Sequence, residues 1–244
     1  MTARRSACLT HFASHGLWYA IMAGVLALCA TGLYTARGAT LESPVPPAAV
    51  DDPLAAGPAR TAVLSGGCFW GMQAVFEHVR GVERVWAGYT GGAASTAHYD
   101  EVSTGTTGHA ESVEIVFDPS KVTYGQLLRV FFSVAHDPTE LDRQGPDVGS
   151  QYRSEVWYAN VEQRRIALDY IAQLERAHVF ASPIVTRVDP LKGFYRAEAY
   201  HQDYLVRHPD QPYIVYNDIP KLASLERLLP AMYRTRPVLV AANR

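Results

Sequence analysis

The chain has 244 residues, of which 48% are hydrophobic and 19% charged, and its net charge is −2 with histidines counted as neutral. This length fits one sizeable domain with an appendage, and the composition excludes an intrinsically disordered chain. The charge lacks the basic excess of a nucleic-acid-binding protein, so we expect no nucleic-acid partner. Three cysteines are too few for a disulfide-stapled scaffold.

The N-terminal region predicts export. Arg4 and Arg5 precede an uncharged run from Leu17 to Tyr34, which is close to the length that a helix needs to cross a bilayer. The flanking charges favour a cytoplasmic N-terminus. Residues 38–60 are rich in Pro and Ala without an apolar period, which predicts an extended linker. We therefore expect residues 1–37 to be a signal peptide or a membrane anchor, and the domain to be periplasmic or otherwise extracytoplasmic; the sequence leaves cleavage and anchoring open.

Apolar alternation, helical spacing and turn residues predict the regular elements of a domain over residues 61–218, followed by a C-terminal tail at 219–244. In chain order they are a strand at 61–65, a helix carrying Met72 to Val79, strands at 82–89 and 112–117, a helix opening at Thr123 with Gln126 as its capping partner, a strand at 155–159, a longer helix capped by Asn160 and Gln163, a strand at 183–188 and a helix at 197–207. The order strand, helix, strand, strand, helix, strand is the split βαβ pattern. We therefore expect an α+β fold of the ferredoxin-like type, a two-layer sandwich with its helices on one face of the sheet.

One stretch has no periodicity. Residues 136–153 contain several turn residues and neither a helical nor a strand pattern. An irregular loop of this length is uncommon in a compact domain and is usually functional. We expect this long loop to contribute to the active site.

Cys68 carries the strongest local signal for chemistry. It follows Gly66 and Gly67 and lies in the first turn of the predicted helix. Free backbone N–H groups and the helix dipole favour an anion there, so this position predicts a stabilised thiolate. The plainer alternative is a buried structural cysteine.

Four motifs then point to one family. They are GCFWG at 67–71, AGYTGG at 87–92, GHAE at 108–111 and QYRS at 151–154. In this order they resemble the peptide methionine sulfoxide reductase A family, over residues 63–209. The resemblance implies an oxidoreductase that repairs oxidative damage by reducing the S epimer of methionine sulfoxide, in oxidised proteins or peptides and in the free amino acid, to methionine.

The chemistry of a sulfoxide explains why two residues should act together. Its sulfur is a poor electrophile until its oxygen is protonated or strongly hydrogen-bonded, so reduction needs a thiolate on one side and an acid on the other. Cys68 would supply the thiolate. Glu111 matches the family's catalytic carboxylate, and partial burial would keep it protonated near neutral pH. Its alternative is an ordinary half-exposed strand residue.

The resemblance implies roles for five further residues. Tyr99 and Tyr152 would donate phenolic hydrogen bonds to the sulfoxide oxygen, and Asp147 would assist from the long loop. Phe69 and Trp70 would form the apolar wall that receives the S-methyl group. Taken singly, the tyrosines and the aspartate fit core tyrosines and a turn aspartate better, and ordinary core packing is an alternative for Phe69 and Trp70.

The cysteine distribution predicts how the enzyme is regenerated. Attack leaves Cys68 as a sulfenic acid, and the sequence has no cysteine after it, while Cys8 and Cys29 lie in the export segment. We expect a monomeric one-cysteine enzyme without a bound cofactor, reduced by an external thiol such as thioredoxin, glutaredoxin with glutathione, or dithiothreitol. His201 and His208 lack a third metal ligand at suitable spacing, so we expect no metal and place both on a helix surface.

Two other functions remain open on the sequence alone. A Cys-His hydrolase would use Cys68 as nucleophile and His109 or His201 as base. An exported binding module would keep Cys68 only as a structural residue. A hydrolase should keep its activity in Glu111→Gln, whereas a sulfoxide reductase should lose it. A binding module should keep its function in Cys68→Ser.

Overall fold

The structure is a computed structural model that describes Leu41 and residues 43–240. The signal peptide or anchor expected over residues 1–37 lies outside the described residues, as do Cys8 and Cys29. No helix in the described part of the chain is long and apolar enough to cross a membrane.

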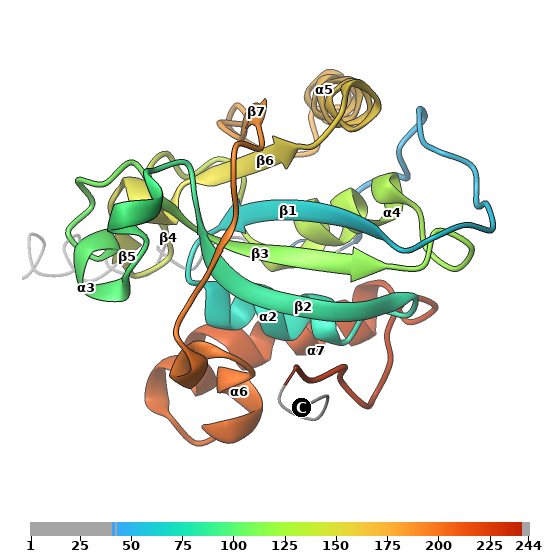
Figure 1. The fold of residues 1–244 in the computed structure, drawn as a ribbon. Coiled ribbons are helices and arrows are strands. Elements are labelled where there is room, and N and C mark those ends of the chain that lie inside the picture. The colour runs from blue at the N-terminus through green and yellow to red at the C-terminus, as the bar shows by residue number, and fades with distance from the viewer. Residues whose placement is uncertain (1–40, 42, 241–244) are drawn as a thin grey trace, which may run out of the picture. The chain divides into compact units, whose positions relative to one another are not determined.

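The centre of the fold is a six-stranded, mostly antiparallel sheet (Figure 1). Its strands lie in the order β7 (Arg187–Pro190), β6 (Ser154–Tyr158), β1 (Arg60–Gly66), β3 (Ala110–Phe117), β2 (Val82–Thr90) and β8 (Tyr195–Arg196). Only the β6–β7 pair is parallel. A separate two-stranded hairpin joins β4 (Arg143–Gln144) to β5 (Asp147–Val148). This mixed architecture is compatible with the expected α+β class.

Helices cover one face of the sheet. They are α2 (Phe69–Glu77), α4 (Tyr124–Val130), which continues as a π-helical turn (Phe131–Ala135), α5 (Val161–Arg176) and α7 (Ile219–Leu228); α3 (Tyr99–Val102) and α6 (Tyr204–Arg207) are short.

Because side chains alternate along a strand, Ala62 and Leu64 of β1 enter the main core, whereas Val63 packs on the other face with Trp157. That other face is crossed by the segment between β7 and β8, which runs over the strands in Figure 1 and contributes Phe194 to the contact.

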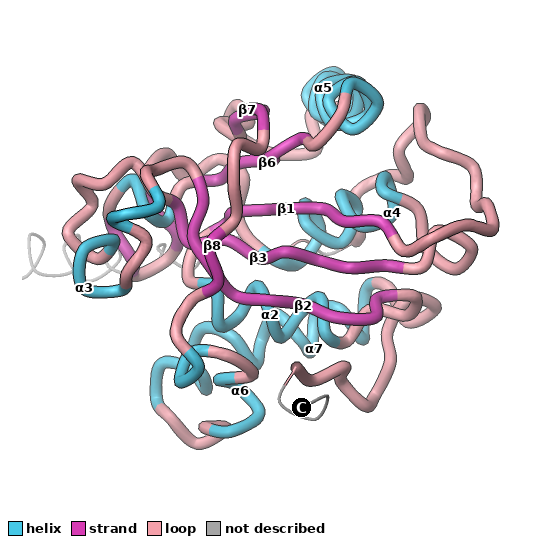
Figure 2. The backbone as a smooth tube through the Cα atoms, viewed as in Figure 1, coloured by secondary structure: helices cyan, strands magenta, loops and turns pink. Residues whose placement is uncertain are grey.

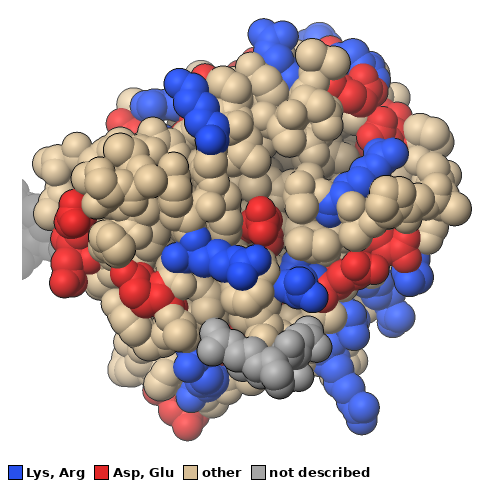
Figure 3. Space-filling model, viewed as in Figure 1, with Lys and Arg blue, Asp and Glu red and all other residues tan. Residues whose placement is uncertain are grey.

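Loops and short helices gather at one end of the sheet, where β1 ends and β3 begins (Figure 2). The hairpin of β4 and β5 and helix α3 lie at this end. On the face shown in Figure 3, acidic and basic side chains are interspersed and form no extended patch of one sign. Because loops held by a rigid sheet often carry functional residues, we expect the site at the end where these loops gather.

The predicted helix starts are confirmed at the level of single hydrogen bonds. The Thr123 hydroxyl accepts from Gln126 N–H at 3.1 Å, and the Gln126 side chain accepts from Thr123 N–H at 3.0 Å. Asn160 accepts from Gln163 N–H at 2.9 Å. Each bond satisfies a donor that the first turn of a helix leaves unpaired.

The strand expected at 183–188 is displaced toward the C-terminus. β7 covers Arg187–Pro190, and residues 183–186 form no helix or strand. The N–H of Val185 donates to the carbonyl of Pro138 at 2.8 Å. This backbone donor is therefore paired with the long loop rather than with a neighbouring strand.

The helix expected at 197–207 is wrong. A 3-10 turn (Ala199–His201) and α6 replace it, because Asp203 adopts a left-handed conformation with φ of 51°. The side chain of Gln202 bonds the N–H and the carbonyl of Ala87, each at 3.0 Å. Binding of this amide to β2 pulls the chain inward and interrupts the helical turn.

The two segments at the edges of the domain pack against it. Residues 43–59 form no helix or strand, as their composition predicts, yet Val45 is buried and its N–H donates to Ser133 at 3.2 Å. The carboxylate of Asp51 accepts from the side chain of Thr123 and from Gly125 N–H. At the other edge, the boundary expected at 218/219 falls inside the helical segment 214–228.

Candidate active site

Cys68 lies at the start of α2, directly after β1, as the sequence predicts. Gly67 before it has a positive φ of 91°, and a Cβ there would lie 2.5 Å from the side chain of Gln144 in the long loop. Glycine is therefore required at this turn for both its conformation and its size. The turn brings the long loop over Cys68, which is 8% exposed.

Glu111 reaches the same helix terminus from β3. Its carboxyl accepts a hydrogen bond of 3.0 Å from the backbone N–H of Phe69, the residue that follows Cys68. Burial raises the pKa of Glu111 to about 8, while the bonds from Phe69 N–H and from the Cys68 side chain oppose the rise. This environment agrees with the expectation that Glu111 keeps its proton near neutral pH.

The surroundings of Cys68 oppose the thiolate that the sequence predicts there. The backbone N–H of Trp70 lowers the pKa of the Cys68 thiol, which is the helix-terminus effect that the sequence predicts. Burial raises the pKa first, and the nearby carboxyls of Glu111, Asp218 and Asp147 raise it further, so the result lies well above the usual value. Desolvation and like charges outweigh one backbone hydrogen bond, and Cys68 is a neutral thiol.

The structure brings Tyr99, Tyr152 and Asp147 to this centre. Tyr99 begins α3, Tyr152 ends a 3-10 turn (Ser150–Tyr152), and Asp147 lies in β5; all three are half-buried. Burial raises the pKa of both phenols, and the charges of Glu111 and Cys68 add to the effect. Both phenols therefore stay protonated as hydrogen-bond donors.

Phe69 and Trp70 occupy different depths. Phe69 is 1% exposed and packs its ring 5.0 Å from that of His201. Trp70 is half-buried, and its indole stacks on Tyr204 at 3.8 Å with an interplanar angle of 7°. Of the two side chains, only that of Trp70 is accessible enough to contact a bound group, whereas Phe69 is part of the core.

Residues near the C-terminus complete the site, and the sequence analysis did not identify them. Tyr213 donates its phenolic hydrogen bond to Asp147, and its ring meets Trp70 edge-on at 5.9 Å. Asp218 and Lys221 form an ion pair of 3.2 Å beside the first turn of α2. No local pattern marks them, because their roles depend on contacts with residues far earlier in the chain.

His201 is also misplaced by the sequence analysis. It is 2% exposed rather than on a helix surface, and its Nδ1 accepts from the indole N–H of Trp70 at 3.1 Å. His201 ends the 3-10 turn, and the extended Gln202 that follows stops the helix expected there. Burial lowers the pKa of His201 to about 4, so it is neutral at physiological pH.

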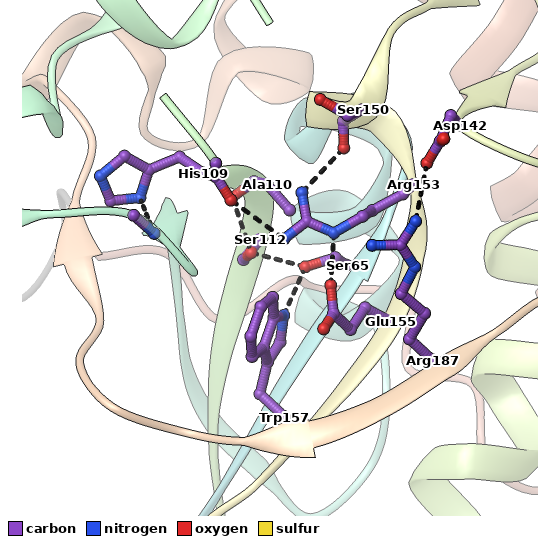
Figure 4. Close-up of polar contacts among 12 residues, drawn as sticks. Ser65, His109, Ala110, Ser112, Asp142, Ser150, Arg153, Glu155, Trp157 and Arg187 are labelled. Atoms are coloured by element: carbon purple, nitrogen blue, oxygen red, sulfur yellow. Dashed lines mark hydrogen bonds and ion pairs between the residues drawn. The ribbon is translucent and has the colours of Figure 1, made fainter. Parts of the chain in front are cut away.

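A buried arginine joins the elements that carry Glu111 and Tyr152 (Figure 4). The guanidinium of Arg153 donates to the carbonyl of Gly108, before β3, at 3.1 Å and to that of Ser150 at 2.9 Å. It also forms an ion pair with Glu155. Arg153 is 7% exposed, and these bonds fix the two loops relative to each other.

His109 is fully engaged and cannot serve as the base of a hydrolase. One ring nitrogen accepts from Gly92 N–H at 3.2 Å, and the other bonds the carbonyl of Ala93 at 2.9 Å. These partners set the tautomer and leave no lone pair for a nucleophile. Among the described residues, no group of three or more His, Cys, Asp or Glu side chains could hold a metal ion.

Comparisons with known proteins agree on one family. Residues 60–230 match the family model described as peptide methionine sulfoxide reductase. The peptide methionine sulfoxide reductase MsrA 2 of Mesorhizobium japonicum is 58% identical over 189 residues, covering 78% of this chain and 97% of that protein. The peptide methionine sulfoxide reductase MsrA of Thermus thermophilus is 46% identical over 177 residues, covering 72% and 99%.

Solved structures resemble the same part of the chain. Methionine sulfoxide reductase A of Corynebacterium diphtheriae has a TM-score of 0.54 at 34% identity, covering 71% of this chain and 86% of that one. Reduced Mxr1 of Saccharomyces cerevisiae has a TM-score of 0.57 at 28% identity, covering 67% and 92%.

Proposed function

Because the chain belongs to the peptide methionine sulfoxide reductase family, we propose that it reduces the S epimer of methionine sulfoxide, free or in oxidised proteins, to methionine. The observation that carries this proposal is the shared helix terminus of Cys68 and Glu111, where the N–H of Phe69 binds the carboxyl at 3.0 Å. A nucleophilic sulfur and a protonated acid at one point match what a sulfoxide requires.

The reaction transfers oxygen from one sulfur to another. The sulfur of Cys68 attacks the sulfoxide sulfur while Glu111 donates its proton to the oxygen, and the thiol proton of Cys68 returns to Glu111. In the intermediate the two sulfur atoms are bonded and the oxygen carries the proton. The S–O bond of the substrate and the new S–S bond then break, the hydroxyl oxygen bonds to the Cys68 sulfur, and methionine leaves. Cys68 is oxidised by two electrons to the sulfenic acid, and the substrate sulfur is reduced by two.

The resting protonation states suit this sequence. A thiol and an acid that both hold protons avoid two adjacent negative charges at the buried site before substrate binds. A bound sulfoxide supplies the acceptor that the Glu111 proton lacks. The thiol proton moves to Glu111 as the Glu111 proton moves to the oxygen. No negative charge therefore accumulates in the buried site.

The remaining residues orient the substrate. Tyr99 and Tyr152 donate hydrogen bonds to the sulfoxide oxygen, and Asp147 is held in place by Tyr213. Trp70 packs against the S-methyl group, whose burial contributes about 1 kcal/mol. Most of the selectivity between epimers must therefore come from how the oxygen is held.

An external thiol restores the enzyme. The first thiol condenses with the Cys68 sulfenic acid to a mixed disulfide and water, and a second thiol releases Cys68 as a disulfide forms between the two reductants. Cys68 is the only cysteine between residues 43 and 240, which supports a reductant from outside the domain. A thioredoxin-like dithiol, or glutathione with glutaredoxin, has the required chemistry.

The cellular setting and the finer fold class are part of the same proposal. The uncharged run at 17–34 supports an exported domain, by cleavage or anchoring. The central order β6-β1-β3-β2, with every neighbouring pair antiparallel, supports a split βαβ core of the ferredoxin-like type.

Turnover of the two epimers tests the function. A methionine sulfoxide peptide, resolved into its S and R epimers, is incubated with the full-length protein and dithiothreitol. We expect reduction of the S epimer alone. Peptide cleavage without reduction, or equal turnover of both epimers, contradicts the proposal.

A further inference from the structure

A buried ion pair lies beside the first turn of α2, and the proposed reaction does not use it. Asp218 ends a π-helical turn (Ile214–Asp218), and Lys221 lies in the first turn of α7. Their side chains are 3.2 Å apart, and the exposed fraction is 0% for Asp218 and 18% for Lys221. A charged pair buried this deeply adds little to stability by itself.

Gly71 allows the pair to touch the helix that carries Cys68. A Cβ at position 71 would lie 2.0 Å from a carboxylate oxygen of Asp218 and 2.9 Å from the Lys221 nitrogen. Gly71 follows Cys68 by three residues, so the two Cα atoms lie within about 5 Å along the helix. The carboxylate therefore sits against the backbone of the turn that presents the nucleophile.

The carboxylate of Asp218 is only half satisfied. One oxygen binds Lys221, while the other is buried and has no hydrogen-bond partner among the described residues. A buried acceptor without a partner is costly and uncommon. Burial raises the pKa of Asp218, the ammonium of Lys221 lowers it, and the charge of Asp147 raises it again. The pairing with Lys221 favours the charged form, and the oxygen without a partner leaves part of that charge uncompensated near Cys68.

We propose that Asp218, held by Lys221 against Gly71, is a positioning residue that keeps Cys68 a neutral thiol while the site is empty. A thiolate beside a buried carboxylate is electrostatically disfavoured. A thiol reacts slowly with electrophiles other than the substrate, since the thiolate is the reactive form. Because no other cysteine lies between residues 43 and 240, this restraint protects the one sulfur on which the proposed function rests.

Other groups around Cys68 are consistent with this role. After burial and Glu111, Asp218 is the next cause that raises the pKa of Cys68. Three carboxyls raise the pKa of Cys68, namely those of Glu111, Asp218 and Asp147. The charge of Cys68 in turn raises the pKa of three phenols, those of Tyr99, Tyr152 and Tyr213. Lys221 is the cation paired with this otherwise acidic set.

The pH dependence of alkylation tests the proposal without turnover. The full-length protein is labelled with iodoacetamide between pH 6 and 11, and the tryptic peptide Thr61–Arg80 is quantified by mass spectrometry, because it contains Cys68 and neither other cysteine. We expect Asp218→Asn to lower the midpoint of labelling by about one pH unit, which is about tenfold faster labelling at a fixed pH below it.

The labelling midpoints of the unchanged protein, Asp218→Asn and a double variant distinguish an electrostatic effect from damage to the fold. Asp218→Asn alone leaves the Lys221 cation unpaired and should give the lowest midpoint. The double variant Asp218→Asn with Lys221→Gln removes both charges and should lie between Asp218→Asn and the unchanged protein. Asp218→Asn with an unchanged or raised midpoint, or a double variant outside this interval, overturns the proposal.

The chain offers a matched control and a second variant. Asp118 and Lys121 form an ion pair with the same spacing, with the Lys121 side chain 67% exposed. The pair follows the end of β3 that is distant from Glu111, and Asp118→Asn should leave the midpoint unchanged. Should Asp218→Asn fail to fold, Lys221→Gln alone removes the counter-charge and should raise the midpoint; a fall contradicts the proposal. Labelling does not depend on sulfoxide reduction, so a failed epimer assay with the expected midpoints would reject only the proposed function.

Discussion

The backbone N–H of Phe69 donates a 3.0 Å hydrogen bond to the carboxyl of Glu111, so the acid from β3 and the sulfur from α2 meet at one helix terminus. The bond fixes where the carboxyl lies without using its proton. The acid therefore stays available for a substrate oxygen while its position is set by the backbone.

Exchange of Glu111 for Gln removes the proton that the sulfoxide oxygen requires. We expect kcat with a methionine sulfoxide peptide to fall by about 10²–10⁴-fold. Circular dichroism should remain unchanged, since the amide can still accept from Phe69 N–H. Glu114→Gln, on the same strand, is the control and should retain activity. Full activity of Glu111→Gln would favour a hydrolase-like use of Cys68.

The raised pKa of Glu111 makes stability depend on pH. Its pKa is about 8 in the folded protein against 4.5 ordinarily, so the folded state holds the proton more tightly than the unfolded state. This contribution is present in full below about pH 4.5 and is lost as the pH rises through about 8. Thermal melts between pH 5 and 9 should show a smaller loss of Tm with rising pH in Glu111→Gln than in the unchanged protein. Parallel curves would show that Glu111 is ionised in both states.

A single turnover without reductant reports on the cysteine chemistry. We expect the full-length protein to release about one equivalent of methionine per chain and then stop, because the sulfenic acid waits for an external thiol. A sulfenic-acid probe should label the peptide Thr61–Arg80. A disulfide between Cys68 and Cys8 or Cys29 in the active protein would refute a one-cysteine enzyme.

Arg153 should position both loops of the site. Arg153→Lys keeps the charge but cannot reach Gly108, Ser150 and Glu155 together, since lysine lacks the planar fork. We expect a loss of about 3 kcal/mol in the free energy of unfolding, from the broken buried network. In addition kcat should fall by about tenfold, because a displacement of the reacting groups weakens catalysis.

The control for this variant lies on the surface of α5. Arg165 pairs with Glu162 and is about half exposed, so Arg165→Lys should change stability and kcat little. Urea denaturation and steady-state kinetics measure both effects. Equal stability of the two variants would show that the Arg153 bonds are dispensable.

Much of the local structure could be predicted because its causes are local. The capping pairs Thr123–Gln126 and Asn160–Gln163 start helices through bonds that span three residues. Likewise, the turn at Gly67 and the position of Cys68 at the start of α2 follow from neighbouring residues. The same reasoning failed for residues 197–207, where an amide bound to a distant strand interrupts the helix.

Spacing and motifs within short stretches were enough to predict most strands and helices, the capping pairs and the family, with residues 183–207 as the exception. The pKa of Cys68 and the contacts of Tyr213 and Asp218 became visible only once distant parts of the chain were brought together. Likewise, the contacts of Val45 with Ser133 and of Asp51 with Gly125 join residues far apart in the sequence. The reason is that desolvation and charge are summed over all atoms around a group, and around Cys68 those atoms come from β3, the long loop and the helix near the C-terminus.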